Sequence, residues 1–357
     1  MYSLVRQEQA NGFIDSVVPS SNASSLNPPK LCIGIASVAR PGEQYVRSTV
    51  GSLLEGLSEQ QRREIHLTVL IAHTEPKDHP IYGEEWLKAA ANKVLLYGVS
   101  EEQLKQLQTW EKEKDYQKKA IFDYTYLLDN CHATSASWIA MIEDDTVAMA
   151  GWYPKAMDAV DVADAQHEWG KTADWLYLRL FYTEEFFGWN AEEWPQYLLA
   201  SVTIVSVLAV FLLGIRLCGV QKLISNHAII AACFFYTPAC IVLYFLAGRL
   251  SMRPLIPGIH QMPRFGCCAQ GFIFSREMAP KVVERLTMKK TGFVDVLLEA
   301  WADEEELVRW AVVPSLLQHI GGRSSKGDDW GGQAKYERSV AEKIWSFGFE
   351  LAGRDGS

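Results

Sequence analysis

The apolar and polar residues in the first half of the chain follow a pattern that predicts strands alternating with helices. Four short runs are almost continuously apolar: LCIGIASVA (31–39), IHLTVLIAH (65–73), KVLLYGV (93–99) and WIAMI (138–142). Such runs are typical of strands in a parallel sheet that is covered on both faces.

Between these strands, apolar residues recur at helical spacing. One predicted helix carries Val46, Val50, Leu53, Leu54 and Leu57. A second, highly charged helix is predicted over residues 101–130, with an apolar face of Tyr116, Ala120, Tyr124, Leu127 and Leu128. The alternation indicates an α/β fold with a mostly parallel sheet.

The last hundred residues contain fewer predicted strands. The run CCAQGFIFSRE (267–277) predicts a strand, and a helix is expected from Met278 to Met288. The stretch 293–313 predicts a helix and then a final strand, PSLLQHIGGRSS (314–325) predicts a loop, and residues 334–347 predict a helix.

Two segments in the middle of the chain contain no charged residue: Trp194 to Ile215, and Ala228 to Gly248. Crossing a bilayer takes roughly 20 apolar residues, so the two segments predict a transmembrane hairpin with spans at 195–215 and 228–248. Pro238 is expected to kink the second span. The alternative is a pair of buried helices in a soluble core.

The short connection between the spans carries Arg216 and Lys222 and no acidic residue. The positive-inside rule therefore places this connection in the cytosol and the rest of the chain on the other side of the membrane. Arg249 and Arg253 follow the second span and weaken the asymmetry.

Neither flank of the hairpin looks like a complete domain. Because a hairpin leaves and re-enters a membrane on the same side, its two ends lie close together. We therefore predict one domain built from residues 31–193 and 249–350, interrupted by the hairpin at 194–248 and preceded by a polar segment at 1–30.

The strand WIAMI runs directly into Glu143, Asp144 and Asp145, called the acidic motif below. Three adjacent carboxylates repel one another and are costly to desolvate unless a cation accompanies them. Ligands of open α/β sheets bind beyond the carboxyl ends of strands, and divalent cations prefer oxygen ligands there. The alternative is an acidic cap on a helix that starts near Thr146.

Charge and cysteine content narrow the function further. The formal net charge of −9 argues against a nucleic-acid-binding protein, which needs a basic face. Cys32, Cys131, Cys267 and Cys268 lie outside the spans and are candidates for disulfides in an oxidising compartment, and no cysteine spacing resembles a zinc site.

Five blocks and the hairpin, in this order, resemble a known family. The blocks are IGIASVARPGEQYVRSTVGSLL, MIEDDTVA, AQGFIFSRE, GFVDVLLEAW and VVPSLLQHIGGRSS. They look like the Golgi glycosyltransferases of the GT-A type, in which a short acidic motif after a strand holds Mn²⁺ and a nucleotide sugar. They are similar to the branching N-acetylglucosaminyltransferase IV family and to its relatives, the GalNAc-transferases that modify GPI anchors after attachment. The hairpin inside the domain selects the second group.

The resemblance implies roles for the acidic motif and for residues after it. Asp145 is expected to ligate the metal directly and Asp144 to contact ribose or metal, with Glu143 as a third metal ligand. His319 is expected to ligate the metal or touch the diphosphate; the alternative is a buried histidine whose hydrogen bonds are satisfied.

The other implied site residues are expected to contact the donor nucleotide sugar or the acceptor sugar. Arg40 is expected to contact uracil or phosphate, with a solvated turn residue as the alternative, and Ser324 and Ser325 to donate hydrogen bonds to phosphate. Asp295 is the expected base for an attacking sugar hydroxyl, with a helix cap as the alternative. The fallback candidates are Asp303 and Glu304, while Lys118 and Lys119 are expected to be solvated.

The resemblance implies an inverting, metal-dependent transfer of an N-acetylhexosamine, GalNAc first, from a UDP-sugar to the mannose of a protein-linked GPI anchor. It places a multi-pass protein in the Golgi membrane, with the endoplasmic reticulum as alternative, and the catalytic domain in the lumen. Rival hypotheses are a luminal N-acetylglucosaminyltransferase for N-glycans or glycolipids, and an inactive membrane scaffold.

The N-terminus departs from the family pattern, in which a span usually precedes the catalytic domain. Residues 1–30 are polar here and contain no apolar signal. We expect that the natural chain starts further upstream. The alternatives are that the first span of the hairpin directs translocation, or that the domain stays cytosolic, which would exclude a luminal acceptor.

Overall fold

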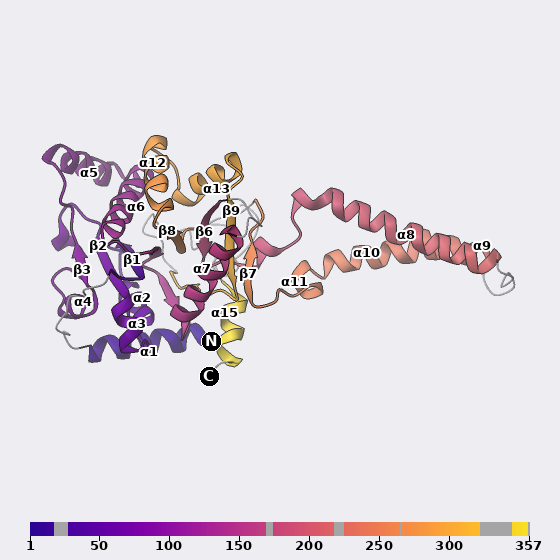
Figure 1. The fold of residues 1–357 in the computed structure, drawn as a ribbon, viewed down its shortest axis with the longest axis horizontal. Helices are drawn as coiled ribbons and strands as arrows, with labels where there is room; N and C mark the ends of the chain where they lie inside the picture. The colour runs from indigo at the N-terminus through magenta and orange to yellow at the C-terminus, as the bar shows by residue number, and fades with distance from the viewer. Residues whose placement is uncertain are drawn as a thin grey trace. The chain divides into compact units, whose positions relative to one another are not determined.

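The computed structural model describes residues 1–17, 28–168, 174–217, 225–264, 266, 268–321 and 345–355. The chain divides into two compact units. The first joins Met1–Thr183 to Pro257–Ser357, and the second, Glu184–Ile256, separates these segments in sequence. The predicted fold is confirmed: an α/β domain of the GT-A-like class is interrupted by a pair of apolar helices (Figure 1).

Eight strands of the described residues form one sheet. Their order is β3 (Lys93–Leu95), β2 (Ile65–Ile71), β1 (Leu31–Ser37), β4 (Trp138–Glu143), β8 (Gly271–Ser275), β6 (Trp175–Arg179), β9 (Val308–Val313) and β7 (Gly258–Gln261). The four strands from β3 to β4 are parallel, as predicted. The rest of the sheet is mixed, because β8 enters between β4 and β6 and runs antiparallel to both. The second segment thus completes the sheet of the first.

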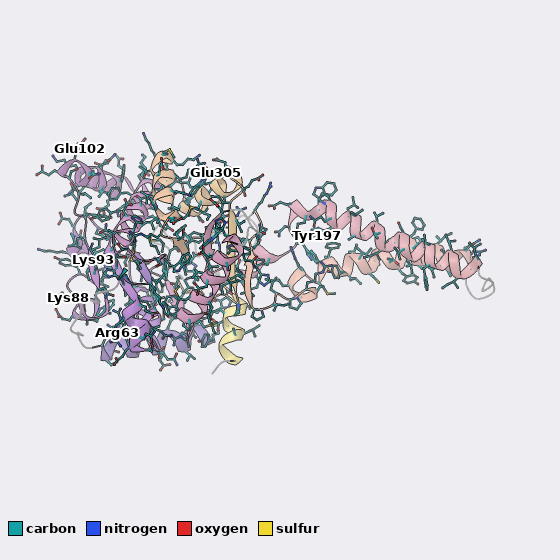
Figure 2. The ribbon with its side chains drawn as sticks, in the orientation of Figure 1. Arg63, Lys88, Lys93, Glu102, Tyr197 and Glu305 are labelled. Atoms are coloured by element: carbon teal, nitrogen blue, oxygen red, sulfur yellow. A yellow bond between two sulfur atoms is a disulfide. The ribbon has the colours of Figure 1, made fainter. Side chains whose placement is uncertain are left out.

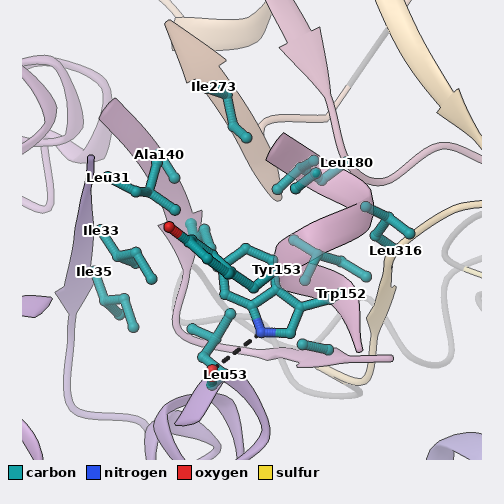
Figure 3. Close-up of a cluster of buried hydrophobic side chains, with 14 of the residues drawn as sticks. Leu31, Ile33, Ile35, Leu53, Ala140, Trp152, Tyr153, Leu180, Ile273 and Leu316 are labelled. Carbon is teal, nitrogen blue, oxygen red and sulfur yellow. Dashed lines mark hydrogen bonds between the residues drawn. The ribbon is translucent and has the colours of Figure 1, made fainter. Parts of the chain in front are cut away.

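Alternate residues of each central strand enter two separate cores. In β1, Leu31, Ile33 and Ile35 belong to one buried cluster and Cys32 belongs to the other. This alternation follows from the two-residue period of a strand, whose successive side chains point to opposite faces. Figure 3 shows the first cluster, where the Trp152 indole N–H donates to the carbonyl of Leu53 at 3.0 Å.

Helices cover both faces of the sheet. The face of the first cluster is covered by α2 (Val46–Leu54) and α7 (Trp152–Glu168). The opposite face is covered by α6 (Tyr116–His132), α12 (Met278–Lys289) and α13 (Val294–Glu304). The remaining elements of this unit are α1 (Tyr2–Ser16), α3 (Glu59–Glu64), η1 (Pro76–Asp78), α4 (Glu85–Ala90), α5 (Glu101–Glu113), β5 (Thr146–Ala148), β10 (Leu317–His319) and α15 (Phe347–Asp355).

The long charged helix expected over 101–130 is two helices, α5 and α6. Lys114 adopts a left-handed conformation with φ of 57° and ends α5, and the Asp115 carboxylate accepts from the Lys118 backbone N–H to begin α6. A non-glycine residue in that conformation stops a helix. The predicted helix at 334–347 falls almost entirely outside the described residues.

The N-terminal segment forms α1, a helix that its polar composition does not predict. Its buried residues, Ser3, Arg6, Ala10 and Ile14, recur at helical spacing and pack on α2 and β5. The Arg6 side chain is 1% exposed; its Nε donates to the carbonyl of Ala148 at 2.9 Å and its Nη1 pairs with Glu55 at 2.5 Å. A buried arginine with partners can serve as an inward-facing residue, which a count of apolar residues misses.

Two further expectations have definite outcomes. A disulfide joins Cys32 in β1 to Cys131 in α6, two of the four candidate cysteines, whose pairing the sequence left open. The expectation that Lys119 is solvated is wrong: its ammonium group is buried and donates to the Ala72 carbonyl at 2.8 Å and to the Asp123 carboxylate at 2.9 Å. Lys118, one position earlier, pairs with Asp115 at 2.6 Å and remains 43% exposed.

The second unit contains the predicted hairpin helices. The first is α8 (Trp194–Leu217), and the second is a continuous run of α9 (Asn226–Ala231), the π-helical turn η4 (Ala232–Tyr236) and α10 (Thr237–Leu246). The helical stretches Glu184–Leu217 and Asn226–Leu246 are long and apolar enough to cross a membrane, and their most apolar windows are only 0% and 11% buried. Such exposure does not fit the alternative of buried helices in a soluble core. Pro238 lies in the first turn of α10, where π geometry gives way to α geometry.

The two ends of the hairpin lie together, as the interrupted-domain prediction requires. The Trp189 indole packs on Tyr197, Tyr244 and Phe245, and its N–H donates to the Phe245 carbonyl at 3.0 Å. Tyr197 is labelled in Figure 2. Short helical turns, η2 (Glu184–Phe187), η3 (Ala191–Glu193) and α11 (Arg249–Met252), flank the two helices. Trp and Tyr rings with one polar edge suit the interface between lipid and water.

Candidate active site

The acidic motif forms the turn that follows β4. Strand β4 ends at Glu143, and the chain continues into strand β5 instead of a helix; the next helix, α7, begins at Trp152. The alternative of an acidic helix cap near Thr146 is therefore wrong. The Thr49 hydroxyl oxygen fixes the turn, lying 2.8 Å from the Asp144 carbonyl and accepting from the Thr146 N–H at 3.2 Å.

Strand β10 brings His319 to this turn. The sequence predicts a loop here, but residues 317–319 pair antiparallel with β5, and His319 lies opposite Thr146. The N–H groups of Ile320 and Gly321 then donate to the Asp145 carbonyl at 2.9 and 3.2 Å. Three residues of backbone pairing thus join two distant parts of the chain into one site.

Glu143, Asp145 and His319 form a cluster that fits a metal ion. Each offers one ligand atom, and these atoms lie within 4.8 Å of one another. The His319 Nε2 is 3.2 Å from Asp145 Oδ2, whereas Asp145 Oδ1 and His319 Nδ1 are buried and find no hydrogen-bond partner among the residues that the structure describes. His319 is therefore not the fully satisfied buried histidine of the alternative. Carboxylates with an imidazole suit Mn²⁺ and related divalent ions.

The charges in this cluster favour its ionised form. Burial alone would raise the pKa of Asp145, but His319 and Arg40 together hold it below its ordinary value. Burial lowers the pKa of His319. The charge and hydrogen bond of Asp145, together with the charge of Glu143, outweigh burial and raise this pKa above its ordinary value. The Asp145 carboxylate is therefore ionised, and a bound cation can replace the His319 ring as the charge partner of that carboxylate.

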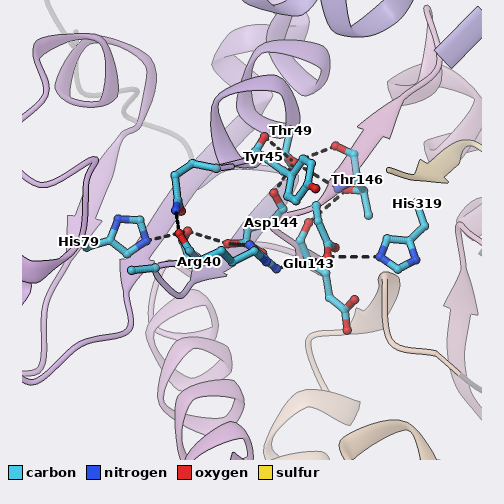
Figure 4. A network of polar contacts seen from close by, with 12 residues as sticks. Arg40, Tyr45, Thr49, His79, Glu143, Asp144, Thr146 and His319 are labelled. Atoms are coloured by element: carbon cyan, nitrogen blue, oxygen red, sulfur yellow. Dashed lines mark hydrogen bonds and ion pairs between the residues drawn. The ribbon is translucent and has the colours of Figure 1, made fainter. Parts of the chain in front are cut away.

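Asp144 is turned toward Arg40 instead of toward the cluster (Figure 4). Its two oxygens accept from the Arg40 guanidinium at 2.8 and 2.6 Å, and the Ser37 hydroxyl donates to it at 2.6 Å. Arg40 also lies 3.2 Å from Asp145 and its side chain is only 8% exposed. The alternative of Arg40 as a solvated turn residue is therefore wrong. A bidentate pair of this kind fixes both side chains in orientation.

Sequence reasoning missed Ser37 and His79, which support Asp144 from behind. The Ile81 N–H donates to His79 Nδ1 at 3.2 Å, so the proton of the neutral ring sits on Nε2, 3.1 Å from the Ser37 hydroxyl. Burial, with His73 and Arg40, lowers the pKa of His79 to about 4 and keeps the ring neutral. A histidine in a loop after β2 gives no signal in the sequence, because only the fold brings it beside β1.

Asp295 lies in the first turn of α13 but does not cap that helix. The N-cap residue is Phe293, and Asp295 Oδ2 accepts from the backbone N–H of Cys268 at 2.7 Å. The helix-cap alternative is therefore wrong. The Cys268 carbonyl in turn accepts from the buried Arg179 at 2.7 Å, which orders the peptide that holds Asp295.

The fallback acids are occupied elsewhere. Asp303 pairs with Arg309 at 2.7 Å, Glu304 pairs with Arg285, and neither lines the cavity beside the acidic motif.

One cavity of about 460 Å³ is lined by all the described candidates except the two fallback acids. Its lining includes Arg40, Glu143, Asp144, Asp145, Asp295 and His319, together with apolar residues of β1, β4 and α13. Ser324 and Ser325 lie outside the described residues. A buried cavity with convergent carboxylates and one arginine is the expected form of a site for a charged small molecule.

Comparison with known families decides which small-molecule chemistry belongs here. The family model described as GPI-N-acetylgalactosamine transferase PGAP4 matches residues 31–318. This chain belongs to that family. The match spans both segments of the α/β domain and the hairpin, and it includes Arg40, the acidic motif and Asp295, ending one residue before His319. No curated protein matches the chain. As a member of the GPI-N-acetylgalactosamine transferase family, the chain is a glycosyltransferase that modifies GPI anchors.

The transferase site depends on a close approach at Gly321. A Cβ on Gly321 would collide with the Asp145 carboxylate. Gly321→Ala is therefore expected to displace Asp145 and lower kcat/KM on the order of tenfold to a hundredfold, as small misplacements in active sites do. Gly12→Ala is the control, since a Cβ there meets nothing within 4 Å. Equal kcat/KM in the two variants would show that Asp145 does not need this position.

Proposed function

We propose that this chain transfers N-acetylgalactosamine from a UDP-sugar to the mannose of a protein-linked GPI anchor, with inversion and with a divalent cation. The observation that carries the proposal is the cavity that gathers the acidic motif, His319 and Asp295 in a chain of the GPI-N-acetylgalactosamine transferase family. We assign binding of the donor and the cation to Arg40, the acidic motif and His319. We assign activation of the acceptor hydroxyl to Asp295.

Glu143, Asp145 and His319 would hold the cation, Mn²⁺ first. Their unpartnered atoms, Asp145 Oδ1 and His319 Nδ1, support this assignment because buried polar groups are otherwise paired. When bound, a divalent cation neutralises the charge of the departing diphosphate. Asp144 remains a candidate metal contact, although its oxygens face Arg40.

The donor nucleotide would lie against Arg40 and Asp144. The guanidinium offers hydrogen bonds to uracil or phosphate, and the carboxylate accepts from ribose hydroxyls. Binding would exchange part of the Arg40–Asp144 contact for contacts to the nucleotide. Ser324 and Ser325 are proposed as hydroxyl donors to the phosphates.

Asp295 would act as the general base. Its carboxylate takes the proton of the mannose hydroxyl, whose oxygen forms a bond to carbon 1 of the sugar while the bond from carbon 1 to the UDP oxygen breaks. The leaving UDP keeps the electron pair of that bond. Attack from the face opposite UDP inverts carbon 1, and the sugar passes through an oxocarbenium-like state as in glycoside hydrolysis.

The hairpin would anchor the catalytic domain to the membrane that holds the GPI lipid. Two exposed apolar helices and their aromatic ends suit a bilayer, and Arg216 at the end of α8 suits a cytosolic turn. The Cys32–Cys131 disulfide favours an oxidising lumen for the domain. We infer a multi-pass protein of the Golgi membrane with a luminal catalytic domain. The alternative location is the membrane of the endoplasmic reticulum.

The proposal is tested by UDP release from the full chain, purified in detergent and supplied with a panel of UDP-sugars and a GPI-anchored acceptor. We expect turnover of UDP-GalNAc with Mn²⁺, loss of turnover with EDTA, and recovery when Mn²⁺ is restored. Turnover of UDP-GlcNAc on N-glycosylated acceptors would replace the proposal with the branching activity. A folded protein that turns over no donor with either acceptor would favour the scaffold.

A further inference from the structure

Two neutral side chains in the cavity carry buried oxygens without a partner among the described residues. They are the Tyr124 hydroxyl, on α6, and the Gln270 carboxamide oxygen, just before β8. Gln270 is 6% exposed. Leaving a buried polar group unpaired destabilises a protein, so such groups in a cavity point to a ligand that pairs them.

Gln270 lies directly beside the acidic motif. Its backbone carbonyl accepts from the Glu143 N–H at 3.1 Å, and the next residue, Gly271, pairs with Ile142 at the end of β4. Tyr124 lies within electrostatic reach of Glu143, Arg179 and Asp295, and burial, more than these charges, raises the pKa of its hydroxyl well above the ordinary value. The hydroxyl therefore stays protonated and able to donate.

Asp123, the neighbouring cavity residue, shows why Tyr124 and Gln270 stand out. Its carboxylate is fully engaged, accepting from Lys119 at 2.9 Å and from Tyr97 at 2.5 Å. The Asp123 carboxylate therefore needs no ligand. The Tyr124 hydroxyl and the Gln270 side-chain oxygen, in contrast, form no hydrogen bond with any described residue.

The two side chains are themselves uncharged, and apolar side chains share the cavity lining with them. Ala36, Val38, Met141 and Ala269 also line the cavity. The Gln270 oxygen is a hydrogen-bond acceptor, so it does not pair with a deprotonated phosphate oxygen, which is also an acceptor. A hydroxyl that donates, a carboxamide that accepts, and nearby alkyl groups are together the complement of an acetamido group, which has one N–H, one carbonyl and one methyl.

We propose that Tyr124 and Gln270 bind the acetamido group of the donor sugar and thereby select an N-acetylhexosamine over a plain hexose. This inference rests on the proposed function, because it assumes a nucleotide-sugar donor in the cavity. Sites whose buried polar groups are paired only by the correct substrate reject analogues that lack the pairing group.

The test compares Tyr124→Phe and Gln270→Leu with wild type in the full, detergent-purified chain. Calorimetry with Mn²⁺ would measure the Kd of UDP, UDP-Gal and UDP-GalNAc, and kinetics would give the ratio of kcat/KM for UDP-GalNAc to that for UDP-Gal. We expect UDP-GalNAc to bind about 3- to 10-fold more weakly in each variant, with a matching fall in the ratio, and UDP and UDP-Gal to bind as before.

Tyr116→Phe is the matched control, since Tyr116 begins the same helix, is 38% exposed and does not line the cavity. The ligand-free Tyr124→Phe protein should melt no lower than wild type, because the deleted hydroxyl has no partner to lose. A variant that weakens UDP as much as UDP-GalNAc overturns the inference, since that outcome marks a general structural role.

The inference and the proposed function fail in different ways. A wild-type chain that prefers UDP-GalNAc, with variants that keep this preference, overturns the role of Tyr124 and Gln270 alone. A wild-type chain that binds UDP-Gal and UDP-GalNAc equally also overturns it. A folded wild-type chain that binds no nucleotide sugar overturns the proposed function, and the inference with it.

Discussion

Asp145→Asn is expected to lower kcat/KM for the nucleotide sugar by about 100-fold or more. Asn keeps the size of the side chain but removes the negative charge that faces His319 at 3.2 Å and lies among the proposed metal ligands. A metal contributes several kcal/mol of charge stabilisation, and roughly 3 kcal/mol corresponds to about 100-fold in rate. The measurements are steady-state kinetics and calorimetric titration with Mn²⁺.

Asp303→Asn is the matched control for this experiment. Asp303 is also an acid of the α/β domain, but it pairs with Arg309 at 2.7 Å and does not line the cavity. Its replacement should leave Mn²⁺ affinity and kcat/KM near the wild-type values. Melting temperatures of both variants separate loss of the site from loss of the fold.

The opposite pattern would reassign the metal. If Asp145→Asn keeps its Mn²⁺ affinity while Asp144→Asn loses it, Asp144 ligates the cation, and the grouping of Glu143, Asp145 and His319 is not the metal site. Such a result would require Asp144 to leave its bidentate contact with Arg40 when the metal binds.

Asp295→Asn is expected to lower kcat by about 10²- to 10⁴-fold while the Kd for UDP-GalNAc stays within a factor of about two. The Asn side-chain oxygen can still accept from the Cys268 N–H, which Asp295 does at 2.7 Å, so the position of the side chain is preserved. The variant loses only the capacity to take a proton. Single-turnover kinetics with acceptor present, beside calorimetry with donor alone, measure the two quantities.

Glu305→Gln provides the control at the other end of α13. Glu305 is exposed, follows the last residue of the helix and does not line the cavity (Figure 2). It should leave both kcat and Kd unchanged. An Asp295→Asn enzyme that turns over at the wild-type rate would rule out Asp295 as the base, and a loss confined to donor affinity would move its role to the donor.

Local patterns sufficed for most elements of the fold. Strands β1, β2 and β4 and helices α2, α12 and α13 were predictable because each is a short run whose apolar period matches its own geometry. The same method failed for α1, whose inward residues include Ser3 and Arg6, and for β10, which is a strand only because β5 lies beside it. In both cases the stabilising partners lie far away in the sequence.

The candidate site shows the same division. The position of the acidic motif at the end of a strand followed from the sequence. The sequence could not separate the three acids. Tertiary contacts do so, because Arg40 and Ser37 hold both oxygens of Asp144, whereas Asp145 and Glu143 are grouped with His319.

By itself the sequence determined the α/β class, the apolar hairpin, the order of the blocks that carry the resemblance and the location of the carboxylates. Only the tertiary structure decided which side chains meet: His319 with Asp145, Asp295 with Cys268, and the unpartnered Tyr124 and Gln270 in one cavity. The physical reason is range. Periodicity records which face of a segment is buried, whereas a site forms where segments distant in the chain pair, and no local pattern records that pairing.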